Sequence, residues 1–339
     1  MNFYKFSISI VLLLSVFILQ AQQTNIPVNI HALSFNPATL LWYAAPAKKW
    51  DEALPVGNGR LGAMVFGKNG EERIQLNEET YWSGGPYSTV VKGGYKVLPE
   101  IQKKVFEEKY LAAHNLFGRN LMGYPVEQMK YQCLANLHLF FKNQDSVTDY
   151  KRWLDLENGI SGVSYTADGI TYQREVFASA PDQVIVVRIT ADKPGSISFT
   201  ANLRGERNQV HSNYATDYFK MDPYGNDGLI LTGKSADYMG VEGKLRYEAR
   251  IKAVPDGGSM KTDDVNLVIE NANSVTLYFA AATNFVNYKD VSADQHQRVT
   301  NYIKAVENKN YNTILTAAIA DYKKYFDRVS LQLPNTKNS

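Results

Sequence analysis

Alternation of apolar and polar residues dominates the chain from about residue 41 to residue 285. In the clearest run, residues 245–253, Leu245, Tyr247 and Ile251 share one face and charged residues occupy the other. Such strict period-two alternation is typical of a half-buried strand. Further strands are predicted at 62–66, 73–76, 134–141, 163–166, 170–177, 184–190, 197–203, 229–232, 265–270 and 275–281. Many short strands separated by Gly, Pro and Asp turns predict a mainly β protein, built as one large antiparallel β-sandwich.

Helical spacing of apolar residues interrupts this pattern in three places. Residues 99–117 predict one helix inserted between strands, and residues 294–306 predict a second helix. The best periodicity lies at 311–329, where Ile314, Ala318 and Tyr322 recur at four-residue spacing. We therefore expect an amphipathic helix there, as part of a C-terminal helical linker. Residues 330–334 predict a last short strand before a polar tail.

The first 21 residues resemble a secretory signal peptide. Lys5 supplies the positive start, Phe6–Leu19 is a mostly apolar run, and Ala21 is a small residue suited to cleavage. The run is shorter than the roughly 20 apolar residues of a membrane-spanning helix, although an uncleaved anchor is the alternative. Residues 22–40 are polar and are expected to form a lead-in. The mature protein is accordingly predicted to be exported and free of the membrane after cleavage.

The cysteine content also bears on the cellular location, because Cys133 is the single cysteine of the chain. An exported chain without an internal disulfide favours a bacterial periplasm or exterior. The formal net charge of +2, with no basic run, gives no electrostatic argument for a nucleic-acid partner. The five histidines have no metal-ligand spacing, so neither a metal nor a cofactor is expected.

Glycines are dense in the stretch Ala53–Pro86, where Gly57, Gly59 and Gly62 spell G-x-G-x-x-G. A dinucleotide site would require this motif between a strand and the start of a helix. Here an apolar strand-like run follows the motif instead. We therefore expect a structural turn in which glycine permits a tight bend.

Four residues are candidates for contact with a sugar: Asn77, Glu78, Trp82 and Trp50. Amide and carboxylate groups can hydrogen-bond adjacent hydroxyls, and an indole can stack on a sugar face. Glu78 and Glu79 cannot by themselves form a glycosidase pair, because neighbours in an extended segment point to opposite faces. Two interpretations of the segment that carries these residues remain. It is either a loop that packs on another domain or a loop that reaches into a cleft formed with that domain.

Five separated blocks agree in order and spacing with one known family. They are 53–86, Tyr131–Leu139, Tyr150–Leu156, Tyr172–Arg188 and Ala280–Phe285. In these blocks the chain resembles glycoside hydrolase family 95, whose members are mostly α-L-fucosidases. The resemblance implies a β-sandwich N-terminal domain at 41–290 and a helical linker at 291–329. A tail at 330–339 would then begin an (α/α)6 catalytic barrel that this sequence lacks.

What this resemblance implies about chemistry is limited. The family's acid and base lie in the barrel, so no catalytic residue can be carried over and the chain alone is expected to be inactive. The whole enzyme would hydrolyse a terminal α-L-fucose, or a related sugar, with inversion. Its partners would be an oligosaccharide substrate and the missing barrel. One departure is the run Cys133–Asn136, where the family usually has Pro-Leu-Gly-Asp.

Two other interpretations remain open from the residues. The chain could be a carbohydrate-binding β-sandwich module that functions by itself. It could also be a truncated or split product, because the apolar stripe of helix 311–329 must bury against something.

Overall fold

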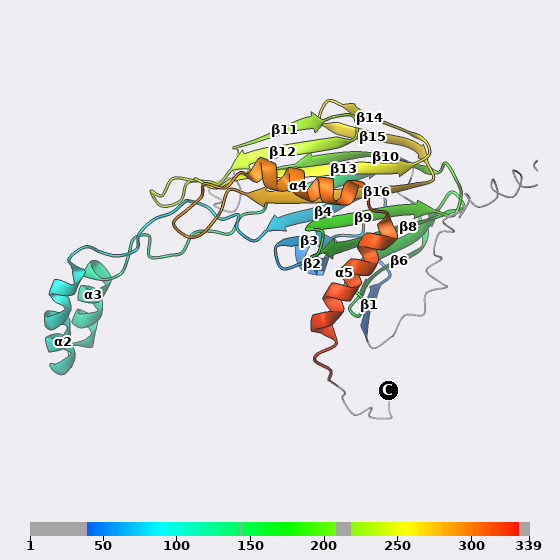
Figure 1. Cartoon of the computed structure of the whole chain (residues 1–339). Helices are drawn as coiled ribbons and strands as arrows, with labels where there is room; N and C mark the ends of the chain where they lie inside the picture. The colour runs from blue at the N-terminus through cyan, green and yellow to red at the C-terminus, as the bar shows by residue number, and fades with distance from the viewer. Residues whose placement is uncertain (1–38, 143, 145, 208–217, 332–339) are drawn as a thin grey trace, which may run out of the picture. The chain divides into compact units, whose positions relative to one another are not determined.

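Two antiparallel sheets share one continuous hydrophobic core (Figure 1). The computed structural model describes residues 39–142, 144, 146–207 and 218–331. Within these residues, inward side chains from both sheets form the core, with Leu76, Leu137 and Phe279 almost fully buried. The prediction of a mainly β protein with a large antiparallel sandwich is confirmed.

The first sheet has nine strands in the order β1-β6-β7-β8-β9-β16-β13-β12-β11. Every neighbouring pair in it is antiparallel. Its strands are β1 (Leu40–Tyr43), β6 (Thr148–Asp155), β7 (Ile160–Ala167), β8 (Ile170–Ser179), β9 (Val184–Ala191), β11 (Phe219–Tyr224), β12 (Gly228–Lys234), β13 (Arg246–Asp256) and β16 (Ser274–Thr283).

The second sheet has seven antiparallel strands in the order β14-β15-β10-β5-β4-β3-β2. Its strands are β2 (Leu54–Gly57), β3 (Leu61–Val65), β4 (Glu71–Glu78), β5 (Ala135–Phe141), β10 (Ile197–Arg204), β14 (Ser259–Asp263) and β15 (Asn266–Ala272). The strands predicted between residues 62 and 281 all fall on strands of these two sheets. The alternation missed β1, β2, β6, β11 and β14, several of which lie at sheet edges and are partly exposed.

Two helices cover the outer face of the nine-stranded sheet (Figure 1). They are α4 (Gln295–Glu307), which packs on β16 and β13, and α5 (Tyr311–Phe326), which packs on β8. Asp294 and Asn310 cap them, since each side chain accepts a hydrogen bond from a backbone N–H of the first turn. Ile314 and Ala318 are buried in this second apolar cluster. The predicted stripe of helix 311–329 is therefore buried against the sandwich over its first half.

Coverage by α4 corrects the expectation that β13 is only half-buried. Glu248 and Arg250, on the face opposite the core, are 3% and 2% exposed and form an ion pair with each other. The carboxylate of Glu248 also lies 3.0 Å from Nδ1 of His296, at the start of α4. The charged face of this strand is thus buried beneath a helix, which alternation along the strand cannot reveal.

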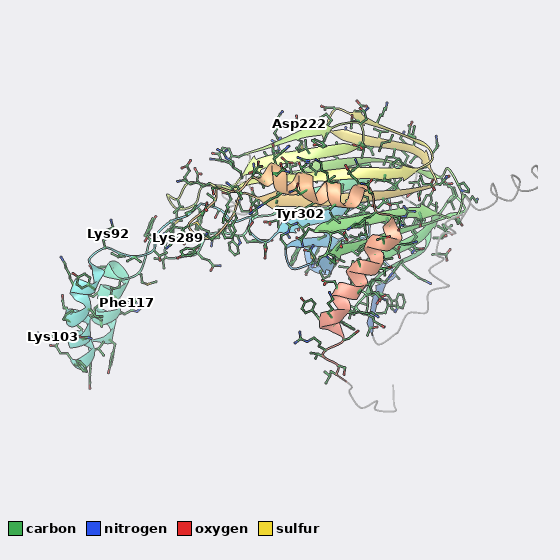
Figure 2. All side chains as sticks on the ribbon, viewed as in Figure 1. Lys92, Lys103, Phe117, Asp222, Lys289 and Tyr302 are labelled. Atoms are coloured by element: carbon green, nitrogen blue, oxygen red, sulfur yellow. The ribbon has the colours of Figure 1, made fainter. Side chains whose placement is uncertain are left out.

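A helical hairpin replaces the single inserted helix predicted at 99–117. A short 3-10 turn, η4 (Gly94–Val97), leads into α2 (Leu98–Phe106), and α3 (Tyr110–Asn120) packs beside α2. The break falls at Glu108, whose φ of +58° cannot continue a right-handed helix. Apolar side chains at the bend are exposed, with Phe106 at 85% and Leu111 at 74%. Lys103 and Phe117 mark the two helices in Figure 2.

Several predicted segments lie partly or wholly outside the described residues. These are the signal peptide at 1–21, nearly all of the lead-in at 22–40 and most of the tail at 330–339. Of the strand predicted at 330–334, residues 330 and 331 are described and are not in a strand. In the described part of the chain, no helix has the length and apolar character needed to cross a membrane.

Candidate functional site

The G-x-G-x-x-G segment forms a tight hairpin between β2 and β3, and Gly57 pairs with Gly62 across it. Asn58 holds the bend, because its side-chain oxygen accepts hydrogen bonds from the N–H groups of Arg60 and Leu61 at 3.1 and 2.7 Å. Gly59 has a φ of +91°, a region that glycine tolerates and other residues avoid. The motif therefore connects two strands, and no helix begins after it.

Arg60, at the end of this bend, connects it to the rest of the fold. Its guanidinium donates to the carbonyl of Ala281 at 2.6 Å and lies 3.4 Å from the carboxylate of Glu78. The same group lies 4.8 Å from the centre of the Tyr302 ring on α4. One side chain thus joins the hairpin, both sheets and α4.

Glu78, one of the predicted contact residues, is 3% exposed at the end of β4. Its carboxylate accepts hydrogen bonds from the N–H and hydroxyl of Thr80 at 2.8 and 2.6 Å. Burial raises the pKa of this carboxyl above its ordinary value, and the bonds from Thr80 and the charge of Arg60 oppose that rise. Asn77 precedes it on the opposite face of β4, where it pairs with Gly62 and is half-buried.

The ends of β4 and β16 meet at one end of the sandwich. The hydroxyls of Thr80 and Thr283, which follow or end these strands, hydrogen-bond to each other. The loops that leave the two strands, 79–90 and 285–291, therefore face one another. Between them lies an open groove of about 1110 Å³, which we call the loop groove. Its floor includes the buried side chains of Met129 and Leu245.

Trp82 forms part of the first wall of the loop groove. Its indole N–H donates to the carbonyl of Glu79 at 2.9 Å, and its ring meets that of Tyr131 edge to face at 5.1 Å. The next residues pack closely, since a Cβ on Gly84 would meet the sulfur of Met129 at 2.5 Å. The Ser-Gly-Gly-Pro run is thus fixed against the body of the protein, and the indole of the preceding Trp82 is held in place.

The second wall comes from the loop that follows β16. It includes Phe285, Asn287, Tyr288 and Lys289, and Tyr288 is 73% exposed. The ammonium of Lys289 lies 5.1 Å from the centre of the Tyr288 ring. Asn284 braces the loop, because its amide donates to the carbonyl of Val291 at 2.7 Å.

Of the four predicted contact residues, the structure places only Trp82 on the loop groove. Trp50 lies elsewhere, in the short helix η3 (Trp50–Glu52), and is 57% exposed. The aromatic residues of the second wall were missed. Phe285 is the last residue of the matched block at 280–285. No pattern along the chain, however, shows which distant loop its side chain faces.

Acidic groups are sparse in the loop groove. Glu79 is the one acidic residue among those that line it. Within the described part of the chain, no group of three or more His, Cys, Asp or Glu side chains could hold a metal ion. Cys133 is partly buried, and burial raises the pKa of its thiol to about 12, so it is a poor nucleophile at neutral pH.

The family model and the curated relatives that match this chain are all of glycoside hydrolases. Residues 41–288 match the family model described as "Glycosyl hydrolase family 65, N-terminal domain". The chain is 30% identical over 327 residues to "Alpha-L-fucosidase 2" of Arabidopsis thaliana, with 88% of this chain and 37% of that protein covered. It is 28% identical over 331 residues to the "Probable alpha-fucosidase A" of Aspergillus niger, with 91% of this chain and 39% of that protein covered.

A related protein of Aspergillus oryzae, also named "Probable alpha-fucosidase A", is 25% identical over 330 residues and covers 90% of this chain and 43% of its own length. The solved structure of a "Putative kojibiose phosphorylase from human microbiome" aligns with a TM-score of 0.48 at 11% identity, over 87% of this chain and 38% of that one. The chain spans well under half the length of the curated relatives it matches. The predicted resemblance to the N-terminal domain of α-L-fucosidase-type hydrolases is confirmed.

Proposed function

Because the chain belongs to the family of glycosyl hydrolase 65-type N-terminal domains, we propose that it is the non-catalytic N-terminal part of an exported α-L-fucosidase-type hydrolase. The whole enzyme would remove a terminal α-L-fucose, or a related sugar, from an oligosaccharide with inversion. An acid would protonate the leaving oxygen while a base activates water, and both groups would belong to a separate catalytic barrel.

The sparse acidity of the loop groove carries the non-catalytic part of this proposal. Glycosidases place two carboxyl groups about 5 Å apart for retention or roughly 6.5–9.5 Å apart for inversion, on either side of the scissile bond. Glu79 is the one acidic residue that lines the groove. The adjacent Glu78 is buried, and its oxygens are taken up by Thr80 and Arg60. The carboxyl groups of these two neighbours therefore do not face the same groove.

The sandwich would support the barrel and complete one side of its cleft. The two helices α4 and α5 already pack on the nine-stranded sheet. Beyond the buried half of α5, Tyr325 near its end and Val329 just after it are exposed. These exposed side chains support a role for the last helix as a linker toward further protein. The relatives support the same role, since each extends far beyond the region that this chain matches.

Export is part of the proposal and rests on the sequence. Residues 1–21 have the charged start, apolar run and small final residue of a signal peptide. A chain with one cysteine cannot form an internal disulfide, and here the stability comes from a large two-sheet core. Recovery of the protein from the periplasm or medium with its N-terminus at residue 22 would support export. Retention of residues 1–21 would contradict cleavage.

The test of the catalytic proposal uses purified residues 22–339 and an aryl α-L-fucoside. We expect no release of the aryl group above the blank. The α-L-fucosidase 2 of Arabidopsis thaliana, assayed beside it, would confirm that the substrate and conditions are suitable. Turnover by the chain alone, abolished by heat and retained on further purification, would contradict the proposal.

A second candidate is a carbohydrate-binding module that works without a catalytic domain. The observation in its favour is the loop groove, which is open and carries aromatic side chains on both walls. Measured affinity of the isolated chain for a glycan separates this candidate from a purely structural domain.

A further inference from the structure

We propose that the loop groove is a binding site for an uncharged, fucose-containing oligosaccharide. The inference rests on the proposed function for the identity of the sugar, and on the lining of the groove for the chemical class. Residues that line it and carry the argument are Glu79, Trp82, Tyr87, Phe285, Tyr288 and Lys289.

Aromatic rings stand on both walls of the loop groove. Trp82 and Tyr87 come from the loop after β4, and Phe285 and Tyr288 come from the loop after β16. The apolar faces of a pyranose ring pack on such rings, and the methyl group of fucose adds apolar area to bury. The volume of about 1110 Å³ exceeds the roughly 300–1,000 Å³ of ordinary small-molecule sites. The groove therefore has room for several linked sugars.

Polar groups alternate with these rings. The carboxylate of Glu79 accepts hydrogen bonds, the ammonium of Lys289 donates them, and the amide of Asn287 does both. Glu79 and Lys289 are the charged residues that line the groove, and their charges cancel. This balance suits a neutral ligand rich in hydroxyls and gives no attraction to a phosphate or sulfate.

The Trp82 ring and the backbone of the opposite loop are held before any ligand arrives. The indole N–H of Trp82 donates to the carbonyl of Glu79 at 2.9 Å, and the indole ring meets the ring of Tyr131 edge to face. The side chain of Asn284 holds the opposite loop, since it accepts from the N–H of Arg246 at 2.8 Å and donates to the carbonyls of Lys244 and Val291 at 3.2 and 2.7 Å. A fixed site loses less conformational entropy on binding, so weak individual contacts suffice.

The experiment titrates the purified chain with fucosyllactose and, separately, with lactose, and follows the ligand by NMR. Tyr288→Ala is the main variant, because this side chain is 73% exposed and its loss should not disturb folding. Tyr325→Ala is the matched control, since Tyr325 is 68% exposed on α5 and does not line the groove. Glu79→Gln keeps the shape of an exposed side chain and removes its charge.

We expect saturable binding of fucosyllactose, weakened roughly 2- to 12-fold by Tyr288→Ala, as for the loss of one ring contact. Glu79→Gln should weaken binding, and Tyr325→Ala should leave it unchanged. The proposal would be overturned by no saturation with the wild type, or by equal affinities of the wild type and Tyr288→Ala. Equal binding of lactose would remove the requirement for fucose. Release of free fucose during the titration would instead contradict the non-catalytic proposal, and the affinities would still report on the groove.

Discussion

The guanidinium of Arg60 stacks on the ring of Tyr302, 4.8 Å from its centre, although 242 positions separate them in the chain. Arg60 ends the glycine-rich bend between β2 and β3, and Tyr302 lies on the outer face of the sandwich in α4. The contact therefore fixes α4 to the glycine-rich bend. It also places a positive charge beside the buried carboxylate of Glu78, at 3.4 Å.

Replacement of Arg60 by alanine should leave Glu78 buried without its charged partner. Because breaking a buried ion pair leaves an uncompensated charge, we expect a loss of about 3 kcal/mol in the free energy of unfolding. Urea denaturation followed by circular dichroism would measure it. Lys103→Ala, at a side chain 74% exposed on α2, serves as the control. Equal unfolding midpoints for Arg60→Ala and the control would show that Arg60 is dispensable.

The bend itself can be tested at its glycines. Gly59 has a φ of +91°, whereas a Cβ on Gly62 would have no atom nearer than 4.0 Å. Gly59→Ala is expected to cost roughly 1–2 kcal/mol, because an L-residue is strained at positive φ. Gly62→Ala should stay within about 0.5 kcal/mol of the wild type. If Gly62→Ala were instead the more damaging change in thermal unfolding, the bend would have been assigned wrongly.

Attachment of α5 to the sandwich depends on a few buried apolar side chains. Ile314 is 0% exposed and lies in a cluster with Phe177 and Val184 of the nine-stranded sheet. Ile314→Ala is expected to cost about 2–5 kcal/mol, as for other large-to-small changes in cores. Tyr325→Ala in the same helix should be nearly neutral, since that ring is exposed. Equal unfolding free energies for the two variants would show that α5 does not depend on this contact.

Stability should depend on pH through Glu175, which lies beneath α5. Burial raises the pKa of its carboxyl above the ordinary 4.5, although the hydroxyl of Tyr311 donates to it at 3.0 Å and opposes the rise. The folded chain then holds this proton at pH values where the unfolded chain has released it. The stabilisation is present below about pH 4.5 and is lost as the pH rises toward the folded pKa.

We therefore expect the free energy of unfolding of the wild type, relative to Glu175→Gln, to fall as the pH rises from 4.5 toward neutrality. The slope of that difference can reach about 1.4 kcal/mol per pH unit. Tyr311→Phe removes the donor to the carboxylate and should extend the fall to higher pH. Parallel curves for the wild type and Glu175→Gln between pH 4 and 8 would contradict a raised pKa.

The sequence alone determined the local elements of this protein. Alternation located most strands because a strand buried on one face repeats its apolar residues every two positions. Helical spacing located α4 and α5 for the same local reason, and the strand-like run after Gly62 excluded a phosphate-binding turn. The five matched blocks were sufficient to indicate an α-L-fucosidase-type N-terminal domain, which the curated relatives and the glycosyl hydrolase family 65 N-terminal model at residues 41–288 support.

Tertiary structure decided which of those elements meet. It buried Glu78, predicted to contact sugar, and it buried the charged face of β13 beneath α4. It also joined the loop after β4 to the loop after β16 through Thr80 and Thr283, and so formed the loop groove. Local periodicity records only whether a side chain faces the core. The neighbours across two sheets are set by strand order and by the packing of helices on their faces, which involve residues up to hundreds of positions apart.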